Sequence, residues 1–302
     1  MKRLISLLMI LVVVLAAFAS CGNKENDYSL SIGVELTETL SNNKITQTVA
    51  TIVTDADGKI VLCRLDCVDY TAAYDVDGNL KTTAPTSKVA QGANYKMDAG
   101  TWAEQGKALE DYVVGKTQAE VAAIALNGGK VTDTDLKASC SIDVTDMLKA
   151  IDNAFKSQYK TTFQASAKAA LTAGLNVSAT VKDSSSDEAK NVKLSTEYAS
   201  VVLADGVVVA AILDTAEPEL KGIVDETGAT SLNYKGTKRA QGDSYGVMDA
   251  GTWYAQADAY AKAAIGKTAS DIATIASEGV AGCTINADGY KAGIEAAVAA
   301  AR

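Results

Sequence analysis

The side chains able to do chemistry in this sequence are carboxylates, hydroxyls and a few cysteines, because none of its 302 residues is histidine. Without histidine the chain cannot form a Ser-His-Asp or Cys-His nucleophile pair, a histidine zinc site or a histidine-ligated haem. A hydrolase is therefore disfavoured, and we expect a protein that is not an enzyme and holds no metal. Any redox chemistry would have to come from a bound cofactor.

Four cysteines follow the first twenty-one residues, at Cys63, Cys67, Cys140 and Cys283. Cys63 and Cys67 lie four residues apart in a strand-like run, which separates their Cα atoms by about 13 Å at roughly 3.3 Å per residue. A disulfide needs Cα atoms closer than about 7 Å, so these two cannot bond without a break in the strand. One of them could pair with Cys140, or all four could be small apolar core residues.

Two glycine-rich segments, 91–100 and 241–251, lead into helix-like runs. Backbone amides at such a helix start can hold an anion. Thr101 and Thr252, which follow these segments directly, would also serve as helix N-caps, and we favour this role over anion binding. The tryptophan that follows each threonine begins an amphipathic pattern, so we place both tryptophans in the core rather than in a ligand site.

The same residues recur about 150 positions apart, and this repeat organises the chain. Met97–Trp102 recurs as Met248–Trp253, and Gly115–Thr117 recurs as Gly266–Thr268. The sequence therefore predicts a tandem duplication of a unit of about 125 residues. Two units of this size are a pair of domains, because a solenoid needs shorter and more numerous repeats.

Each unit begins with a pattern typical of an antiparallel β-meander. Apolar residues alternate with other residues at 32–36 and again at 175–181, which indicates half-buried strands. Asp57-Gly58 and Asp205-Gly206 are turn dipeptides between apolar runs, so each predicts a hairpin.

Each unit then changes to helical spacing, starting at its tryptophan and returning in a last helix at 147–155 or 290–298. We expect two tandem α+β repeats, each with helices packed on one face of its meander, at 28–160 and 164–302. In the first unit the last helix should run on to Leu171, with Gly174 as its stop. Each unit should fold alone.

The N-terminus has the layout of an export signal. Lys2 and Arg3 precede an apolar run of about 15 residues from Leu4 to Phe18, which is shorter than the roughly 20 residues that span a bilayer. Small residues then lead to Cys21. This order resembles the lipobox of bacterial lipoproteins. The resemblance implies that residues 1–20 are a signal peptide and that lipid attaches at Cys21.

The same resemblance implies a polar tether at 21–27 and a body anchored to the cell membrane on its extracytoplasmic side. Removing Lys2 and Arg3 lowers the basic count from 28 to 26 against 37 acidic residues, a net charge near −11. An acidic body of this kind argues against a nucleic-acid partner and against a membrane-hugging surface.

The end of the second unit carries a short motif before its last helix. Glu278, Gly282 and Thr284 stand at intervals similar to those at the end of bacterial FMN-binding domains. Those domains occur in lipid-anchored flavoproteins that carry electrons outside the cell and in subunits of ion-pumping redox complexes. Their pattern is an acidic residue, any two, Ser or Thr, Gly, Ala and Thr, and the last Thr accepts FMN through a phosphoester bond made by a separate transferase.

The resemblance implies that Thr284 is the FMN acceptor, with Ala281 in place of the hydroxyl residue and Cys283 in place of alanine. In the first unit it places Asp135 at the acidic position and Ser141 at the acceptor position, with the glycine replaced. The implied function is an electron carrier with an extracytoplasmic redox partner.

Two alternatives accompany this interpretation. The segment Thr227–Thr230 matches the core of the motif, but Asp225 is one residue too close and no helix follows, so we interpret it as a turn. The alternative function is a non-enzymatic surface lipoprotein that binds a small ligand or a protein partner.

Overall fold

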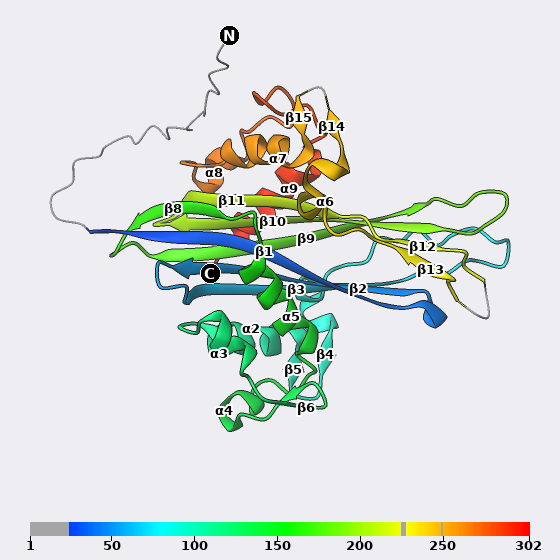
Figure 1. Ribbon diagram of the computed structural model, residues 1–302, viewed down its shortest axis with the longest axis horizontal. Helices are drawn as coiled ribbons and strands as arrows, with labels where there is room; N and C mark the ends of the chain where they lie inside the picture. Colours follow the sequence, from blue (N-terminus) through cyan, green and yellow to red (C-terminus); the bar gives the residue numbers. More distant parts are fainter. Residues whose placement is uncertain (1–23, 225–227, 249) are drawn as a thin grey trace, which may run out of the picture.

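The computed structural model describes residues 24–224, 228–248 and 250–302, so the predicted signal peptide and the predicted lipid site at Cys21 lie outside the described residues. The described chain forms four layers, with two antiparallel sheets packed face to face and helices on the outer side of each sheet (Figure 1). The prediction of a mixed α+β fold with antiparallel sheets is confirmed. No helix in the described residues is long and apolar enough to cross a membrane.

The first sheet has the strand order β3-β2-β1-β8. Its strands are β1 (Glu25–Thr39), β2 (Lys44–Asp55), β3 (Ile60–Thr71) and β8 (Thr161–Ser166). The predicted turn between β2 and β3 is present, because Asp55 Oδ1 accepts the backbone N–H groups of Asp57 and Lys59 at 3.0 and 2.9 Å. Gly58 has φ +74°, a conformation that favours glycine.

The second sheet contains the long meander β9 (Leu171–Asp183), β10 (Val192–Ala204) and β11 (Val207–Ala216). The short strands β12 (Glu219–Lys221) and β13 (Ser231–Asn233) extend it beside β10. The predicted turn at Asp205-Gly206 joins β10 and β11, and both residues have positive φ.

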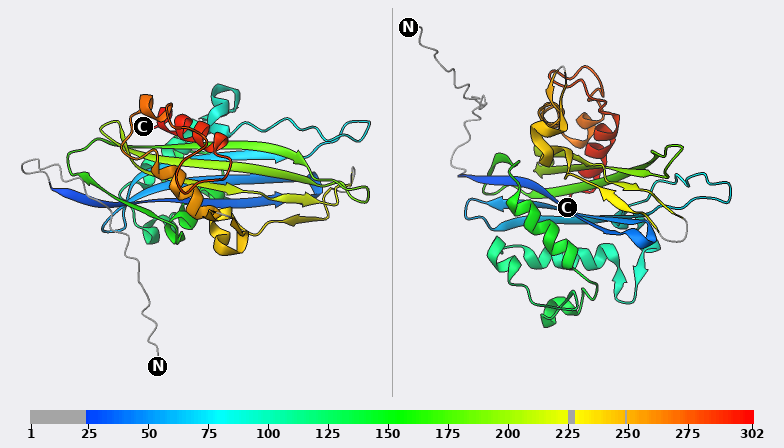
Figure 2. Two further views of the ribbon diagram at one scale, coloured as in Figure 1. Left: turned by 90° about the horizontal axis from the view of Figure 1, so that it is seen from above. Right: turned by 45° about the vertical axis from the view of Figure 1, so that its right-hand side comes forward.

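Each sheet has its own set of helices on its outer face (Figure 2). The first set is α1 (Lys88–Gln91), α2 (Trp102–Val113), α3 (Gln118–Ala122), α4 (Thr134–Lys137) and α5 (Thr145–Lys156), with the short pieces η2 (Gly92–Asn94), β4 (Lys96–Met97), β5 (Gly100–Thr101), β6 (Leu126–Asn127) and β7 (Lys130–Val131). A further short piece, η1 (Leu40–Asn42), joins β1 to β2. The second set is α6 (Lys238–Gln241), η3 (Gly242–Tyr245), β14 (Val247–Met248), β15 (Gly251–Thr252), α7 (Trp253–Lys262), α8 (Ala269–Ile272) and α9 (Asp288–Ala299).

The two threonines before the tryptophans are helix caps, as expected. Thr101 forms a capping box, in which its hydroxyl accepts from Glu104 N at 3.1 Å and Glu104 Oε2 accepts from its backbone N–H at 2.7 Å. Thr252 Oγ1 accepts from Ala255 N at 3.4 Å. Trp102 and Trp253 are buried in the two outer cores, which confirms their placement.

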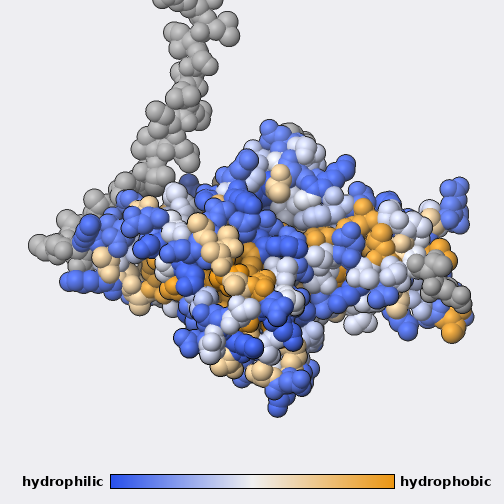
Figure 3. All heavy atoms as spheres, turned by 60° about the horizontal axis from the view of Figure 1, so that its bottom comes forward, coloured by the Kyte–Doolittle hydropathy of each residue, from blue (hydrophilic) through white to orange (hydrophobic). Residues whose placement is uncertain are grey.

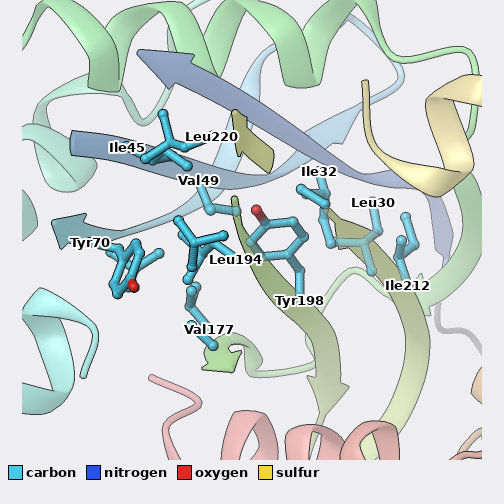
Figure 4. Packing of buried hydrophobic residues seen from close by; sticks show 14 of the residues in the cluster. Leu30, Ile32, Ile45, Val49, Tyr70, Val177, Leu194, Tyr198, Ile212 and Leu220 are labelled. Carbon is cyan, nitrogen blue, oxygen red and sulfur yellow. The ribbon is translucent and has the colours of Figure 1, made fainter. Parts of the chain in front are cut away.

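The central core lies between the two sheets and draws on both halves of the chain (Figure 4). Leu30 and Ile45 from the first sheet pack with Leu194 and Tyr198 from the second, and all four are fully buried. The hydroxyl of Tyr198 donates a hydrogen bond across this layer to Oε1 of Gln47. The inner face of each sheet is therefore covered by the other half of the protein, and only the outer face is covered by the sheet's own helices.

One junction between the sheets is closed by charged groups. Arg64 Nε on β3 donates to the carbonyl of Ala173 on β9 at 2.9 Å. The buried carboxylate of Glu110 accepts from Leu65 N at 2.8 Å and lies 2.8 Å from Nη2 of Arg302. Burial raises the pKa of Glu110, while Arg302 and the bond from Leu65 act in the opposite direction.

The predicted extension of the last helix of the first unit to Leu171 is wrong. Helix α5 ends at Lys156, and the chain then forms β8 and β9. Phe163 and Ala165 are buried on β8 while Thr162 and Gln164 are exposed, which is strand periodicity. Gly174, expected as a helix stop, lies inside β9.

The bounds of the predicted tether and domains also need correction. Glu25–Asp27 were expected in the tether but belong to β1, where Glu25 pairs with Ser166 of β8. The segment 161–166, which contains the start proposed for the second unit, therefore belongs to the first sheet. The physical reason is that the edge of β1 needs a strand partner, and β8 supplies it.

Candidate functional site

The hydroxyl predicted to accept FMN is held by a buried amide. Thr284 is exposed on the loop between α8 and α9. Its backbone N–H and its hydroxyl both donate to Oε1 of Gln256, at 2.8 and 2.9 Å. Gln256 is fully buried on α7, and its Nε2 donates to the carbonyl of Gly251 at 3.1 Å. This amide fixes the direction of the hydroxyl proton and leaves the oxygen lone pairs of Thr284 unused by it.

The other residues of the predicted motif lie on the same loop without contacting the hydroxyl. Gly282 is exposed and has φ +82°, so the chain uses its conformational freedom in the bend before Thr284. Glu278 is also exposed, and no hydrogen bond joins it to Thr284 among the described residues. The structure therefore places these three residues on one loop and gives a defined partner to Thr284 alone.

The first half contains the same arrangement around Ser141. Its backbone N–H and hydroxyl donate to Oε1 of the fully buried Gln105 at 2.9 and 3.1 Å, and Gln105 Nε2 donates to the carbonyl of Gly100 at 3.3 Å. Ser141 is half-buried, so its oxygen is less accessible than that of Thr284. Asp135 lies on α4 and lines a separate hollow with Lys107, and it does not contact Ser141.

Gln105 and Gln256 were missed by sequence reasoning, although a signal was present. Each glutamine stands three residues after its tryptophan, on the same face of the helix as a buried apolar stripe. A polar residue at that position in both halves indicates a buried hydrogen-bonding role.

A second matched pair of polar groups lies under α1 and α6. Asp66 accepts from the hydroxyl of Ser87 at 2.7 Å and from the backbone N–H groups of Val89 and Cys67 at 3.0 and 2.7 Å. Burial raises the pKa of Asp66 to about 6, although these hydrogen bonds act to lower it. The carboxylate therefore fastens the start of α1 to β3.

The equivalent group in the second half is Asp214, which is buried on β11. It accepts from the hydroxyl of Thr237 at 2.6 Å and from the backbone N–H groups of Arg239 and Thr215 at 3.0 and 2.7 Å. Burial raises the pKa of Asp214 as well. Each carboxylate accepts three hydrogen bonds from the protein, which makes both structural groups rather than free general bases.

A lysine packs against aromatic rings in each half. Lys88 Nζ lies 5.9 Å from the centroid of Trp102 and 3.1 Å from Asp69. Lys238 Nζ lies 5.6 Å from the centroid of Trp253 and 3.1 Å from Glu217. Burial alone would lower the pKa of Lys238, but its bonds to Tyr245 and Glu217 raise it, so the ammonium group stays charged.

The four cysteines after residue 21 are free thiols buried in the two outer cores. Burial raises the pKa of Cys67 to about 12, so its thiol is protonated and unreactive at neutral pH. Of the two interpretations considered for these residues, the structure supports small core side chains. No group of three or more cysteine, aspartate or glutamate side chains in the described part of the chain is placed to hold a metal ion.

A groove of about 390 Å³ opens between β1 and β11 on the side opposite the Arg64 junction. Strand β8 covers the outer edge of β1 only as far as Leu30. Beyond it, Asn153 Nδ2 donates to the carbonyl of Val34 at 2.9 Å, which shows that Val34 directs its backbone groups to this edge. The lining includes side chains from both halves: Ile32, Asn153, Tyr159, Ile212, Tyr234 and Arg239.

The surface of the sandwich is partly apolar. Apolar side chains gather along the sandwich between the two helical lobes on the face in Figure 3, whereas the lobes are mostly hydrophilic.

Comparisons with protein-family models, with curated proteins and with solved structures found no match.

Proposed function

We propose that this protein is an extracytoplasmic lipoprotein that carries FMN on Thr284 and serves as an electron carrier. The observation that supports it is Thr284, an exposed residue whose hydroxyl is oriented by a fully buried amide. An exposed side chain normally samples several rotamers, so fixing this hydroxyl lowers the entropy lost when a transferase engages it.

The chemistry required of the protein is limited. The Oγ1 atom of Thr284 forms a bond to the FMN phosphorus of a flavin dinucleotide brought by the transferase, while the P–O bond of the pyrophosphate breaks, the nucleoside monophosphate leaves and the hydroxyl proton passes to a base. Gln256 accepts a hydrogen bond from that proton but is too weak a base to remove it, so the transferase must supply the base. Once attached, the flavin supplies the redox chemistry.

We further infer that the two halves are a tandem duplication with unequal roles. The bonds of Gln105 to Ser141 and Gly100 match those of Gln256 to Thr284 and Gly251. Because Ser141 is half-buried, the second half should carry flavin and the first should carry less or none.

The test is co-expression with a flavin transferase, followed by intact mass after denaturation. One added FMN should be present in the wild type and absent in Thr284→Val. Thr230→Val is the matched control, because Thr230 is an exposed threonine in the competing motif whose hydroxyl donates to Lys221 O. An unmodified wild-type mass, with no flavin fluorescence in the native protein, would refute the proposal.

The lipid anchor has its own test. Cys21→Ser should release the protein into the medium or leave the precursor uncleaved, because the thiol that takes the lipid is gone. A Cys21→Ser protein that still incorporates labelled fatty acid and stays on the membrane would contradict the anchor.

The groove between β1 and β11 favours a second candidate, a surface lipoprotein that binds a small ligand. Its volume of about 390 Å³ is within the usual range for ligand sites. Ala240→Trp would fill the groove from α6, because Ala240 lines it and is exposed. A small molecule released on denaturing the wild type, absent from Ala240→Trp and found in a protein without flavin, would favour this candidate.

A further inference from the structure

One end of the sandwich gathers the start of β1 and a turn from each helical lobe (Figure 1). In the first half, Gly115 N donates to the carbonyl of Ile60 at 2.7 Å and Ile60 N donates to the carbonyl of Lys116 at 2.9 Å. These bonds fasten the turn after α2 to the first residue of β3. Strand β1 begins at the same end, because Tyr28 pairs with Asp55 beside the β2–β3 turn.

The second half repeats this construction. Gly266 N donates to the carbonyl of Val208 at 2.8 Å, and Val208 N donates to the carbonyl of Lys267 at 2.9 Å. The turn after α7 is thereby fastened to the start of β11, next to the turn at 205–206. The first residues of β3 and β11 therefore lie at one end with both turns, and β1 begins at this end and extends past them, because Ile60 is level with Ser29 and β1 starts at Glu25 (Figure 1).

Each turn exposes a large aliphatic side chain immediately before its glycine. Val114 is 46% exposed and Ile265 is 41% exposed. Few large apolar side chains are exposed to this degree in the described chain; the others are Val76, Leu126 and Val224. Both turns hold their aliphatic side chain outward through backbone bonds, so the exposure is built into the fold in each half.

Each turn carries one lysine and one capping carboxylate, whereas the start of β1 and the β2–β3 turn at the same end carry Glu25, Asp27, Asp55 and Asp57. Lys116 and Lys267 follow the glycines, and each is beside a capping carboxylate, Glu120 or Asp271. Hydrogen bonds from Thr117 lower the pKa of Glu120, and bonds from Thr268 do the same for Asp271, so both carboxylates are charged. Each turn thus presents a near-neutral surface with an aliphatic tip, unlike the acidic protein as a whole.

The chain between Cys21 and this end is short. Four residue steps join Cys21 to Glu25, the first residue of β1, and they reach at most about 14 Å. A lipid on Cys21 would therefore keep this end of the sandwich within about 14 Å of the bilayer surface.

We propose that the bilayer surface is the partner of this end, with the side chains of Val114 and Ile265 entering the headgroup region. The inference rests on the lipid anchor at Cys21 proposed above. The two turns then lie on opposite sides of the anchored end of the sandwich, and the long axis of the strands points away from the membrane. The acidic sides of the protein then face solvent, and the contact is limited to one end.

The experiment places a fluorophore at each end of the lipidated full-length protein. The variants are Val114→Cys and Ile265→Cys at the proposed contact, with Val76→Cys as the matched control at the far end. Four native thiols are buried, those of Cys63, Cys67, Cys140 and Cys283. The sulfur of a lipidated Cys21 would be part of a thioether and could not react with the label. Labelling is therefore confined to the introduced cysteine in each variant.

Each labelled protein is bound to vesicles of phosphatidylcholine and phosphatidylglycerol that contain a headgroup nitroxide lipid. We expect at least about twofold quenching at positions 114 and 265 and little at 76, because the 12 residues of β3 separate the two ends by about 40 Å. Quenching should change little with salt, since the turns are near neutral.

Vesicle flotation separates this inference from the anchor. Protein that floats with vesicles but shows equal quenching at 76 and 114, or none at 114 and 265, would overturn the orientation and leave the anchor intact. Protein that carries no lipid by mass and does not float would overturn the anchor and the orientation together.

Discussion

The close approach of α9 to β9 depends on the absence of a side chain at Gly174. A Cβ atom at this position would lie 1.7 Å from the carbonyl oxygen of Ala297, where real Cβ contacts essentially never fall below 3.0 Å. In Gly174→Ala the helix must therefore move outward by more than about 1 Å. Overpacking of this kind costs typically 1–3 kcal/mol, and we expect about 3 kcal/mol because a whole helix must shift.

The measurement is urea unfolding of residues 24–302, monitored by circular dichroism. A loss of about 3 kcal/mol corresponds to a fall in Tm of roughly 5 °C for a protein of this size. The slope of the unfolding free energy against urea should stay unchanged, since the surface exposed on unfolding is the same. Near-ultraviolet circular dichroism should also change, because Tyr290 on α9 packs against Trp253 at a ring distance of 6.0 Å.

Gly106→Ala is the matched control. Gly106 lies inside α2, and its added Cβ would meet Trp102 at an ordinary 3.4 Å. This variant should be neutral or more stable by up to about 1 kcal/mol, because alanine favours a helix over glycine. A cost below about 0.5 kcal/mol for Gly174→Ala, or an equal loss in both variants, would refute the close-approach argument.

Three further predictions concern buried charge and the shared core. The pKa of Asp66 is about 6 in the folded protein against 3.8 for an ordinary aspartate, so the folded state binds more protons than the unfolded state between these pH values. The free energy of unfolding should therefore fall as pH rises from about 4 to 6. Urea titration at each pH should show that this slope weakens in Asp66→Asn. Arg302→Ala should cost about 1–2 kcal/mol, with little further cost when Glu110→Gln is already present, in a double-mutant cycle. Residues 167–302 expressed alone should bind a hydrophobic dye and show no cooperative melt, because their sheet loses the cover of the first sheet; a sharp two-state transition would instead support the independent folding expected from the repeat.

The features that sequence reasoning placed well are those set by local rules. The capping threonines Thr101 and Thr252, the core tryptophans after them and the hairpin turns each depend on neighbours within a few residues. Their recurrence about 150 residues later allowed one half to support the interpretation of the other.

The features that were missed depend on contacts between distant segments. Strand β2 is buried on both faces, yet it contains Gln47, Thr48 and Thr51, so its pattern did not show that a second sheet covers it. Gly174 looks like a helix stop in sequence, and its true role requires knowledge that α9 crosses it. The same distinction holds for the candidate site. Thr284 could be predicted from a local motif, whereas the contact of Gln256 with it is known only from the fold.

The pairing of β1 with β8 sets an order for folding. Glu25 pairs with Ser166, a separation of 141 residues, and closing so long a loop carries an entropic cost of about 4 kcal/mol before any contact is gained. The intervening meander and helices must therefore collapse first and bring the two ends together. During synthesis the leading strand would wait, with the edge that later pairs with β8 unpaired, until most of the first half had emerged. The chain would need protection of that edge during this interval, and refolding in vitro should be slower and more prone to aggregation than in a protein whose first strand finds all of its partners nearby in the sequence.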